Sequence, residues 1–326
     1  GVPTMTMTPE QATWFSGIAD RIVDNVERVL LGKSYVIRLG LTAMLSEGHL
    51  LLEDVPGTGK TSLARALAQS IRGTTTRVQF TPDLLPGDIT GMTVYDQRTG
   101  AFEFRRGPVF ATVVLADEIN RASPKTQSAL LEVMEEGHVT IDGVTHPVSA
   151  PFLVIATQNP IEQAGTYRLP EAQLDRFLMK TAIGYPDHAA TVRILEGAVG
   201  PRAEVLEPVV ELDTVRDMIG LARTAHVDPV ITDYTARLVE ATRAHPDVRM
   251  GASVRGALAL IRCAKTFAAL QGRHYVIPDD VKALAEPVLA HRLVLDPESE
   301  FDGVTSTSVI AQLVVETPPP SERIAV

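Results

Sequence analysis

The sequence of 326 residues contains a single cysteine, Cys263, which excludes an internal disulfide. It lies in an alanine-rich helical pattern, where we expect a small buried side chain rather than a nucleophile. No run of about 18 apolar residues occurs, so no membrane insertion is expected. The stretch from Gly1 to Pro9 also lacks the charged and apolar segments of a signal peptide. We therefore expect a cytoplasmic protein.

The chain also has no excess of positively charged residues. The formal net charge is −10 and the isoelectric point is about 5.3. Non-specific nucleic-acid binding depends on cationic groups at the phosphates, so no nucleic acid is expected as the main partner. A local basic patch, such as Arg105 and Arg106, remains compatible with this balance. Hydrophobic residues make up 45% of the chain and charged residues 21%, which is typical of a globular protein of one large or two ordinary domains.

The most informative motif follows the apolar run that ends at Leu52. A Pro/Gly turn, then Lys60 and Thr61, then a helical pattern predict a strand, a glycine loop and a helix. Glycines let a loop wrap a phosphate with its N–H groups, and the helix N-terminus adds partial positive charge. We expect ATP to contact this loop, with Lys60 on the β- and γ-phosphates and Thr61 on Mg²⁺. The expected contact residues are Asp54, Val55, Pro56, Gly57, Thr58, Gly59, Lys60, Thr61 and Ser62.

A second apolar run, residues 112–116, ends in Asp117 and Glu118. This pattern is typical of a buried strand in a parallel sheet, whose carboxyl end is where open α/β sheets bind ligands. Asp117 can hold the Mg²⁺ that bridges the phosphates, and Glu118 can polarise a water for attack on the γ-phosphate. Alternatively, the two carboxylates only cap the helix expected over residues 124–136.

A third apolar strand, residues 152–158, leads to Asn159. The side-chain amide of Asn159 could hydrogen-bond the γ-phosphate or the attacking water and so report the nucleotide state. The alternative is that Asn159 and Pro160 only form a turn.

These three strand ends, in this order, resemble the Walker A, Walker B and sensor 1 motifs of AAA+ ATPases. The strings at residues 51–61, 117–127, 156–160 and 169–177 resemble the MoxR family more closely, over roughly residues 21–310. In that family Asp54 is typical at the first P-loop glycine position, whereas Arg168 and Val254 stand where proline is usual. The resemblance implies an α/β fold: a P-loop AAA+ core with a parallel sheet between helices, followed by a small all-helical lid domain.

We expect five segments along the chain. They are an N-terminal extension (1–20), the nucleotide-binding core (21–187), a linker (188–210), the helical lid (211–310) and a disordered tail (311–326). Two hairpin insertions, near 81–108 and 137–148, are expected within the core. They would contact client proteins, or alternatively only pack on neighbouring subunits.

The resemblance also implies three further site residues. Arg176 is the expected arginine finger, which acts on a neighbouring subunit's nucleotide; the alternatives are a salt bridge with Asp175, or Arg168 as the finger. Arg255 resembles sensor 2, a lid arginine that reaches the γ-phosphate, and is otherwise a solvated charge. Gly32 lies at a break between two helices that would touch the adenine, or is simply a turn.

The sequence thus predicts a Mg-dependent ATPase of the MoxR type. The resemblance implies a ring homo-oligomer, a hexamer, that remodels client proteins, often ones with von Willebrand factor A domains. Two alternatives are an AAA+ nucleic-acid motor and a nucleotide-gated binding scaffold with little turnover.

Overall fold

The computed structural model describes residues 5–53, 57–158, 167, 169–197 and 206–321. Five parallel strands form the central sheet in the order β2-β5-β8-β1-β9. Their bounds are β1 Leu50–Glu53, β2 Thr75–Gln79, β5 Val113–Asp117, β8 Leu153–Gln158 and β9 Met179–Thr181. The helices of this part are α1 Pro9–Glu27, α2 Ser34–Leu45, α3 Lys60–Ser70, α4 Gly87–Thr90, α5 Pro124–Glu136, α6 Glu171–Leu174 and α7 His188–Leu195, with the short turn η1 Ile119–Arg121.

Alternate residues along the strands pack on opposite faces of the sheet. Leu115 and Ile155 join one hydrophobic cluster, whereas Val114 and Val154 join another. A parallel strand covered on both faces must be apolar throughout, which is why these strands read as continuous hydrophobic runs. The predicted α/β core with its parallel sheet is confirmed.

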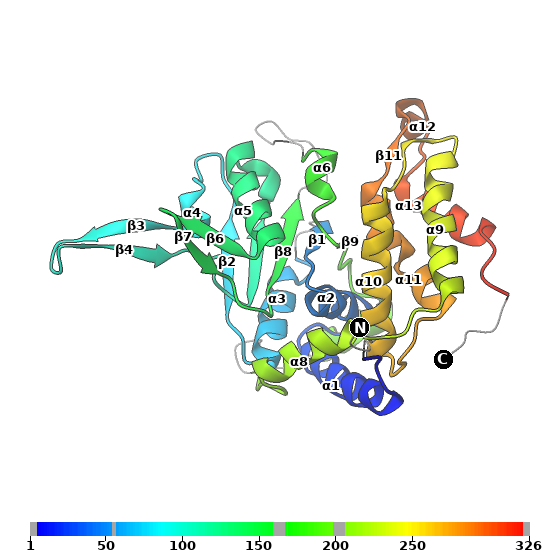
Figure 1. Ribbon diagram of the computed structural model, residues 1–326, viewed down its shortest axis with the longest axis horizontal. Helices are drawn as coiled ribbons and strands as arrows, with labels where there is room; N and C mark the ends of the chain where they lie inside the picture. Colours follow the sequence, from blue (N-terminus) through cyan, green and yellow to red (C-terminus); the bar gives the residue numbers. More distant parts are fainter. Residues whose placement is uncertain (1–4, 54–56, 159–166, 168, 198–205, 322–326) are drawn as a thin grey trace.

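The lid follows as a group of helices, on the right in Figure 1. It contains α9 Pro229–Ala244, α10 Val254–Leu270, α11 Pro278–Leu289, η3 Ala290–Arg292, α12 Pro297–Phe301 and α13 Ser306–Glu316. Helix α8 Leu212–Ala222 precedes them and lies below the sheet in Figure 1, in contact with α2. A short antiparallel ladder, β10 Val248–Met250 with β11 Val294–Leu295, accompanies them. The predicted helical lid is confirmed.

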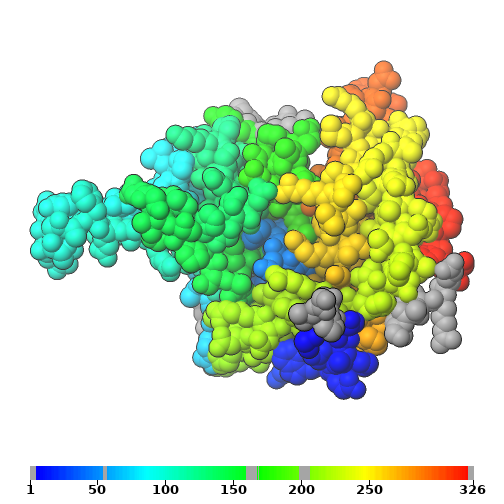
Figure 2. Space-filling model, viewed as in Figure 1, coloured from blue at the N-terminus to red at the C-terminus, as the bar shows by residue number. Residues whose placement is uncertain are grey.

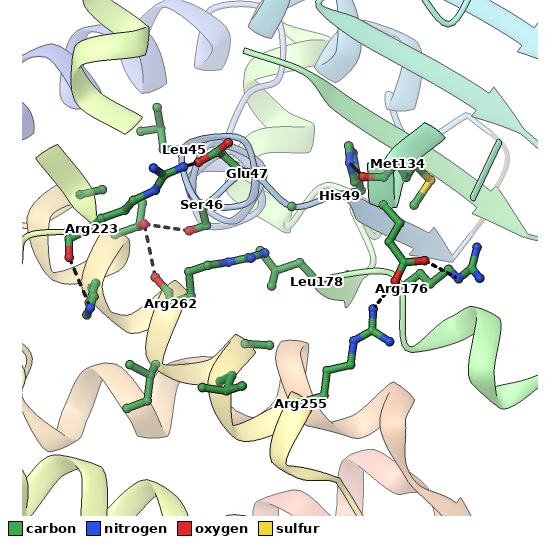
Figure 3. Close-up of a pocket in the computed structure, with 18 of the residues that line it drawn as sticks. Leu45, Ser46, Glu47, His49, Met134, Arg176, Leu178, Arg223, Arg255 and Arg262 are labelled. Atoms are coloured by element: carbon green, nitrogen blue, oxygen red, sulfur yellow. Dashed lines mark hydrogen bonds and ion pairs between the residues drawn. The ribbon is translucent and has the colours of Figure 1, made fainter. Parts of the chain in front are cut away.

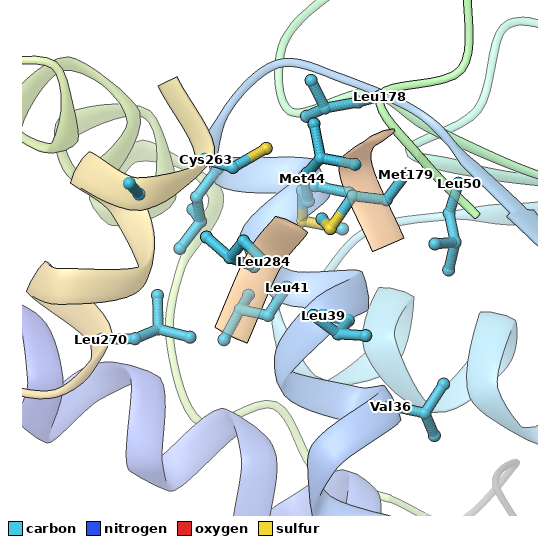
Figure 4. Packing of buried hydrophobic residues seen from close by; sticks show 14 of the residues in the cluster. Val36, Leu39, Leu41, Met44, Leu50, Leu178, Met179, Cys263, Leu270 and Leu284 are labelled. Atoms are coloured by element: carbon cyan, nitrogen blue, oxygen red, sulfur yellow. The ribbon is translucent and has the colours of Figure 1, made fainter. Parts of the chain in front are cut away.

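One hydrophobic cluster is continuous from the core helices α1 and α2 into α10 and α11 of the lid (Figure 4). Met44 and Leu50 share it with Leu284 and with Cys263, whose side chain is fully buried as expected. The Ser46 hydroxyl also donates to the hydroxyl of Thr266 across this contact, at 2.7 Å. The lid therefore packs on the core through buried apolar surface.

Three helices, one of them with its N-terminal cap, extend across the expected segment boundaries. Residues 9–20 belong to α1, because a capping box at Thr8 starts this helix and Phe15 and Ile18 are buried in the core. Helix α7 lies inside the expected linker, and Asp187 caps it. Helix α13 continues to Glu316, so residues 311–316 are not a disordered tail.

Both expected hairpins are present. The first pairs β3 Gly91–Asp96 with β4 Ala101–Arg106, and the second pairs β6 His138–Ile141 with β7 Val144–Pro147. The first projects far from the body of the molecule (Figures 1 and 2). In the described residues no helix is long and apolar enough to cross a membrane.

Candidate nucleotide site

The glycine loop joins β1 to α3 at the carboxyl end of the sheet. Gly57 and Gly59 have φ angles of +77° and +103°, which L side chains rarely adopt. A Cβ built on Gly59 would lie 2.6 Å from Leu30 Cδ1, so the loop also packs closely on the turn between α1 and α2. Thr61 and Ser62 lie in the first turn of α3. Asp54, Val55 and Pro56 lie outside the described residues.

Lys60 and Asp117 meet at this edge of the sheet. Lys60 Nζ lies 2.9 Å from Asp117 Oδ1, and the Asp117 side chain is only 2% exposed. The hydroxyl of Thr157 donates to the same oxygen at 2.7 Å, and Arg77 Nη2 donates to Oδ2 at 2.6 Å. Burial raises the pKa of Asp117, but the hydrogen bonds from Lys60, Thr157 and Arg77 outweigh it and lower the pKa. Asp117 is therefore an ionised carboxylate at neutral pH.

Glu118 follows in a left-handed conformation, with φ +54° and ψ 54°. Non-glycine residues seldom adopt it, and such strain concentrates at functional sites. The Glu118 backbone N–H donates to the Thr157 hydroxyl at 2.8 Å, and Gln79 Nε2 donates to Glu118 Oε2 at 3.0 Å. Thr157 thus holds both acidic residues, because its hydroxyl accepts from Glu118 and donates to Asp117.

These residues fit Mg²⁺ and a nucleoside triphosphate. A hydroxyl and an ionised, buried carboxylate are hard oxygen ligands, and Mg²⁺ sites use one or two carboxylates together with substrate phosphates. Lys60 and the N-terminus of α3 supply positive charge at the same place. Asn159 lies outside the described residues, directly after β8, and its role stays a prediction.

Gly32 has a φ of +73°, and a Cβ on it would lie 3.2 Å from the Cβ of Ala190 in α7. Beside it, Lys33 Nζ donates to the carbonyl of Tyr185 at 2.7 Å. The turn therefore lies between the glycine loop, which Leu30 contacts, and α7. Its expected contact with adenine stays a prediction.

Arg176 and Arg255 lie together in a cavity of about 650 Å³ between core and lid (Figure 3). Both pair with Glu135: Arg176 Nε lies 3.3 Å from Oε2, and Arg255 Nη2 lies 2.9 Å from Oε1. Arg255 Nε is also 3.5 Å from Asp175 Oδ2. The salt-bridge partner of Arg176 is thus Glu135 of α5, and not the neighbouring Asp175.

This cavity lies at the amino edge of the sheet, opposite the glycine loop. His49 directly precedes β1, and its Nε2 lies 3.2 Å from the carbonyl of Met134, next to Glu135. Helix α5 starts after β5 at the carboxyl edge and runs back, so that Glu135 lies at the amino edge. The lid therefore places Arg255 beside Arg176 and away from the glycine loop of its own chain. Its expected contact with a γ-phosphate stays a prediction.

The segment that carries Arg176 is held by a buried arginine of the lid. Arg292, whose side chain is 4% exposed, donates from Nε to Asp175 Oδ1 at 2.8 Å. Its other nitrogens donate to the carbonyls of Asp175 at 3.1 Å and of Phe177 and Leu178 at 3.2 Å. The ring of His291 bonds the Phe177 carbonyl as well, at 2.8 Å.

Sequence reasoning missed Arg77, Gln79, Thr157 and Arg292. Arg77 and Gln79 are two residues apart on one strand, so both point to one face near its carboxyl end. Polar residues with this spacing at a strand end were the signal that could have found them. No local pattern marks Arg292 as a support of the Arg176 segment, because its partners in that segment lie more than 100 residues away.

Comparison with known proteins agrees with this geometry. Residues 49–179 match the family model of the ATPase family associated with various cellular activities (AAA), and residues 240–313 match the AAA lid domain. A crystal structure of a protein from Cytophaga hutchinsonii, classed as an ATPase, superposes with a TM-score of 0.87. It is 37% identical, with 96% of this chain and 98% of that chain covered. The chain therefore has the fold and loop of an AAA ATPase with its lid.

Two relatives identify the family of AAA ATPases to which the chain belongs. Chaperone MoxR1 of Mycobacterium tuberculosis is 42% identical over 90% of this chain and 80% of the relative. The uncharacterized protein YeaC of Bacillus subtilis is 48% identical over 94% of this chain and 96% of the relative. The chain belongs to the MoxR family of AAA+ ATPases.

Proposed function

We propose that this protein hydrolyses ATP with Mg²⁺ at the carboxyl edge of its sheet. The observation that carries the proposal is the contact of Lys60 with an ionised, buried Asp117, with Glu118 held next to it by Thr157. Lys60 would bind the β- and γ-phosphates, while Thr61 and Asp117 would hold the metal. Bound Mg²⁺ would supply charge neutralisation on the phosphates. Glu118 would orient and polarise the attacking water.

Two substitutions separate binding from chemistry. Lys60→Ala should abolish tight ATP binding, because the phosphates lose their cation. Glu118→Gln should bind ATP normally and hydrolyse it far more slowly, because an amide is a poor base. Calorimetric titration and phosphate release measure the two effects. Lys125→Ala, an exposed lysine on α5, is the matched control. Undiminished ATP affinity in Lys60→Ala would refute the assignment of the glycine loop.

We further propose that hydrolysis needs a neighbouring subunit. Arg176 and Arg255 lie at the amino edge, so phosphates at the carboxyl edge of another chain are the ones they would reach. An arginine supplied in this way stabilises charge on the transferring phosphoryl group and is worth about 10³–10⁵ in rate. Contact between two different edges is heterologous, and it closes into a ring when the rotation allows. The ring size that the family resemblance implies is a hexamer.

Mixing two inactive variants tests this arrangement. Arg176→Ala should bind ATP normally but lose most hydrolysis, whereas Lys60→Ala loses the pocket and keeps the finger. Mixed rings join an intact pocket to an intact finger, so activity should return. Arg168, outside the described residues, is tested in the same way as the competing finger. If sedimentation shows mixed rings and neither arginine gives recovery, the finger is not on this segment.

We propose that the hydrolysis cycle remodels client proteins. The name of the mycobacterial relative, a chaperone, supports this class of work. The hairpin β3–β4 is a candidate contact surface, because the tilted rings of Phe102 and Tyr95 lie 5.3 Å apart near its tip with 76% and 55% of their surface exposed. Clients with von Willebrand factor A domains are what the family resemblance implies. A pull-down with Glu118→Gln, in the presence of ATP, should hold clients; Phe102→Ser in the same background should release them.

A further inference from the structure

Two side chains of β2 hold the two acidic residues that follow β5. Arg77 Nη2 lies 2.6 Å from Asp117 Oδ2, and Gln79 Nε2 lies 3.0 Å from Glu118 Oε2. The strands are direct neighbours in the sheet, with Gln79 paired to Asp117 in register. Arg77 therefore reaches a carboxylate at the carboxyl edge of the sheet, inside the site proposed for Mg²⁺.

The two oxygens of Asp117 have different partners. Oδ1 accepts from Lys60 and from Thr157, both of which belong to the loop and strand ends around the nucleotide. Oδ2 accepts from Arg77. The Asp117 side chain is 2% exposed and is held by three hydrogen bonds, whereas the Arg77 side chain is 51% exposed. A metal that takes Oδ2 would therefore displace the guanidinium into water at small cost.

We propose that Arg77 is a positioning residue that neutralises Asp117 when no metal is bound and yields Oδ2 when Mg²⁺ arrives with the nucleotide. The inference rests on the proposed nucleotide site. Without metal, a nucleotide's phosphates approach an ionised carboxylate, and like charges close together repel. Arg77 removes part of that repulsion. With metal, Arg77 competes for the same oxygen. Arg77 thus makes nucleotide binding less dependent on Mg²⁺.

Removal of Arg77 should affect nucleotide affinity differently in the absence and in the presence of Mg²⁺. In Arg77→Gln, ADP should bind more weakly in EDTA, because Asp117 loses one of its two countercharges and keeps only Lys60, and ADP should bind equally or more tightly with Mg²⁺. The ratio of the two dissociation constants should rise by about twofold to fivefold, which corresponds to the upper part of the range for exposed ion pairs. A general loss of structure would weaken both states and leave the ratio near its original value.

The experiment measures ADP affinity by calorimetry in EDTA and in excess Mg²⁺ for the full chain. Arg98→Gln is the matched control, because Arg98 is an exposed arginine on the hairpin loop and its loss changes the net charge equally. Arg77→Lys should recover part of the original ratio, since it restores the charge. In an Asp117→Asn background, Arg77→Gln should change the ratio no further.

An unchanged or lower ratio in Arg77→Gln, with Lys60→Ala defective in ADP binding, overturns this inference and leaves the proposed function standing. If Lys60→Ala binds ADP as tightly as the original protein, both this inference and the proposed function are refuted. An equal rise of the ratio in Arg98→Gln would show a general charge effect and would also overturn the role of Arg77.

Discussion

Replacement of Arg292 by methionine should destabilise the protein strongly. Methionine keeps the length of the stem but removes the guanidinium, whose four contacts with residues 175–178 are 2.8 to 3.2 Å long. Removal of one partner of a buried ion pair costs about 3–5 kcal/mol. Asp175 is 22% exposed and keeps Arg255 at 3.5 Å, so the lower half of that range is expected.

The midpoint of thermal unfolding should fall by about 4–6 °C, at about 1.5 °C per kcal/mol for a chain of this size. Arg72→Met is the matched control. Arg72 pairs with Glu211 at 2.9 Å, but both side chains are more than 60% exposed, so its loss should cost less than about 1 kcal/mol. Urea denaturation of both variants measures the difference. If the two losses agree within about 1 kcal/mol, the buried contacts of Arg292 contribute no more than a surface pair.

The same variant has a functional consequence. Arg292 holds the backbone on both sides of Arg176, whereas Lys60 and Asp117 lie at the other edge of the sheet. Arg292→Met, assayed well below its unfolding temperature, should therefore bind ATP normally and hydrolyse it more slowly. A loss of ATP affinity equal to the loss of hydrolysis would mean that the damage has spread to the glycine loop.

Three further predictions concern stability and reactivity. Gly57→Ala and Gly59→Ala should each add about 1–2 kcal/mol of backbone strain, but only Gly59→Ala also displaces buried Leu30, so urea denaturation should show the larger loss for Gly59→Ala. His49 is neutral because burial lowers its pKa to about 4. The unfolded chain, in which this histidine has an ordinary pKa near 6.5, takes up the proton first, so the free energy of unfolding should fall as the pH drops from 6.5 towards 4, by about 1 kcal/mol at pH 5.5 for this residue. His49→Asn should show a shallower fall. Burial raises the pKa of the Cys263 thiol to about 12, so a thiol reagent at pH 8 should label it only as fast as the protein opens.

The sequence alone predicted the motifs that end strands, because carboxyl ends of parallel strands meet at one edge. Lys60, Asp117 and Glu118 each lie in a short sequence motif, and the parallel sheet brings these motifs together independently of the rest of the fold. Arg77 gave only the weaker signal of its polar spacing with Gln79, since its importance depends on the pairing of β2 with β5, a contact across 40 residues. The position of Arg255 could not be predicted for a related reason: a short motif can identify a lid arginine, but the packing of α10 on α1 and α2 decides which edge of the sheet it faces.

The position of Glu135 connects the two edges. In this chain it accepts both Arg176 and Arg255, so neither arginine is free to bind a phosphate. In the proposed ring, the phosphates of a neighbour's nucleotide compete with Glu135 for the two guanidinium groups, and with Asp175 for that of Arg255. A triphosphate carries more charge and more acceptor oxygens than Glu135, so it should displace Glu135 from the two arginines when ATP is bound. After hydrolysis the nucleotide should compete less well for them. Asp175 pairs with both Arg255 and Arg292, which belong to the lid. Release of Arg255 from Glu135 would therefore change the contacts of the lid in the same step. The contact between subunits would then report nucleotide state directly to the part of the molecule that has to move.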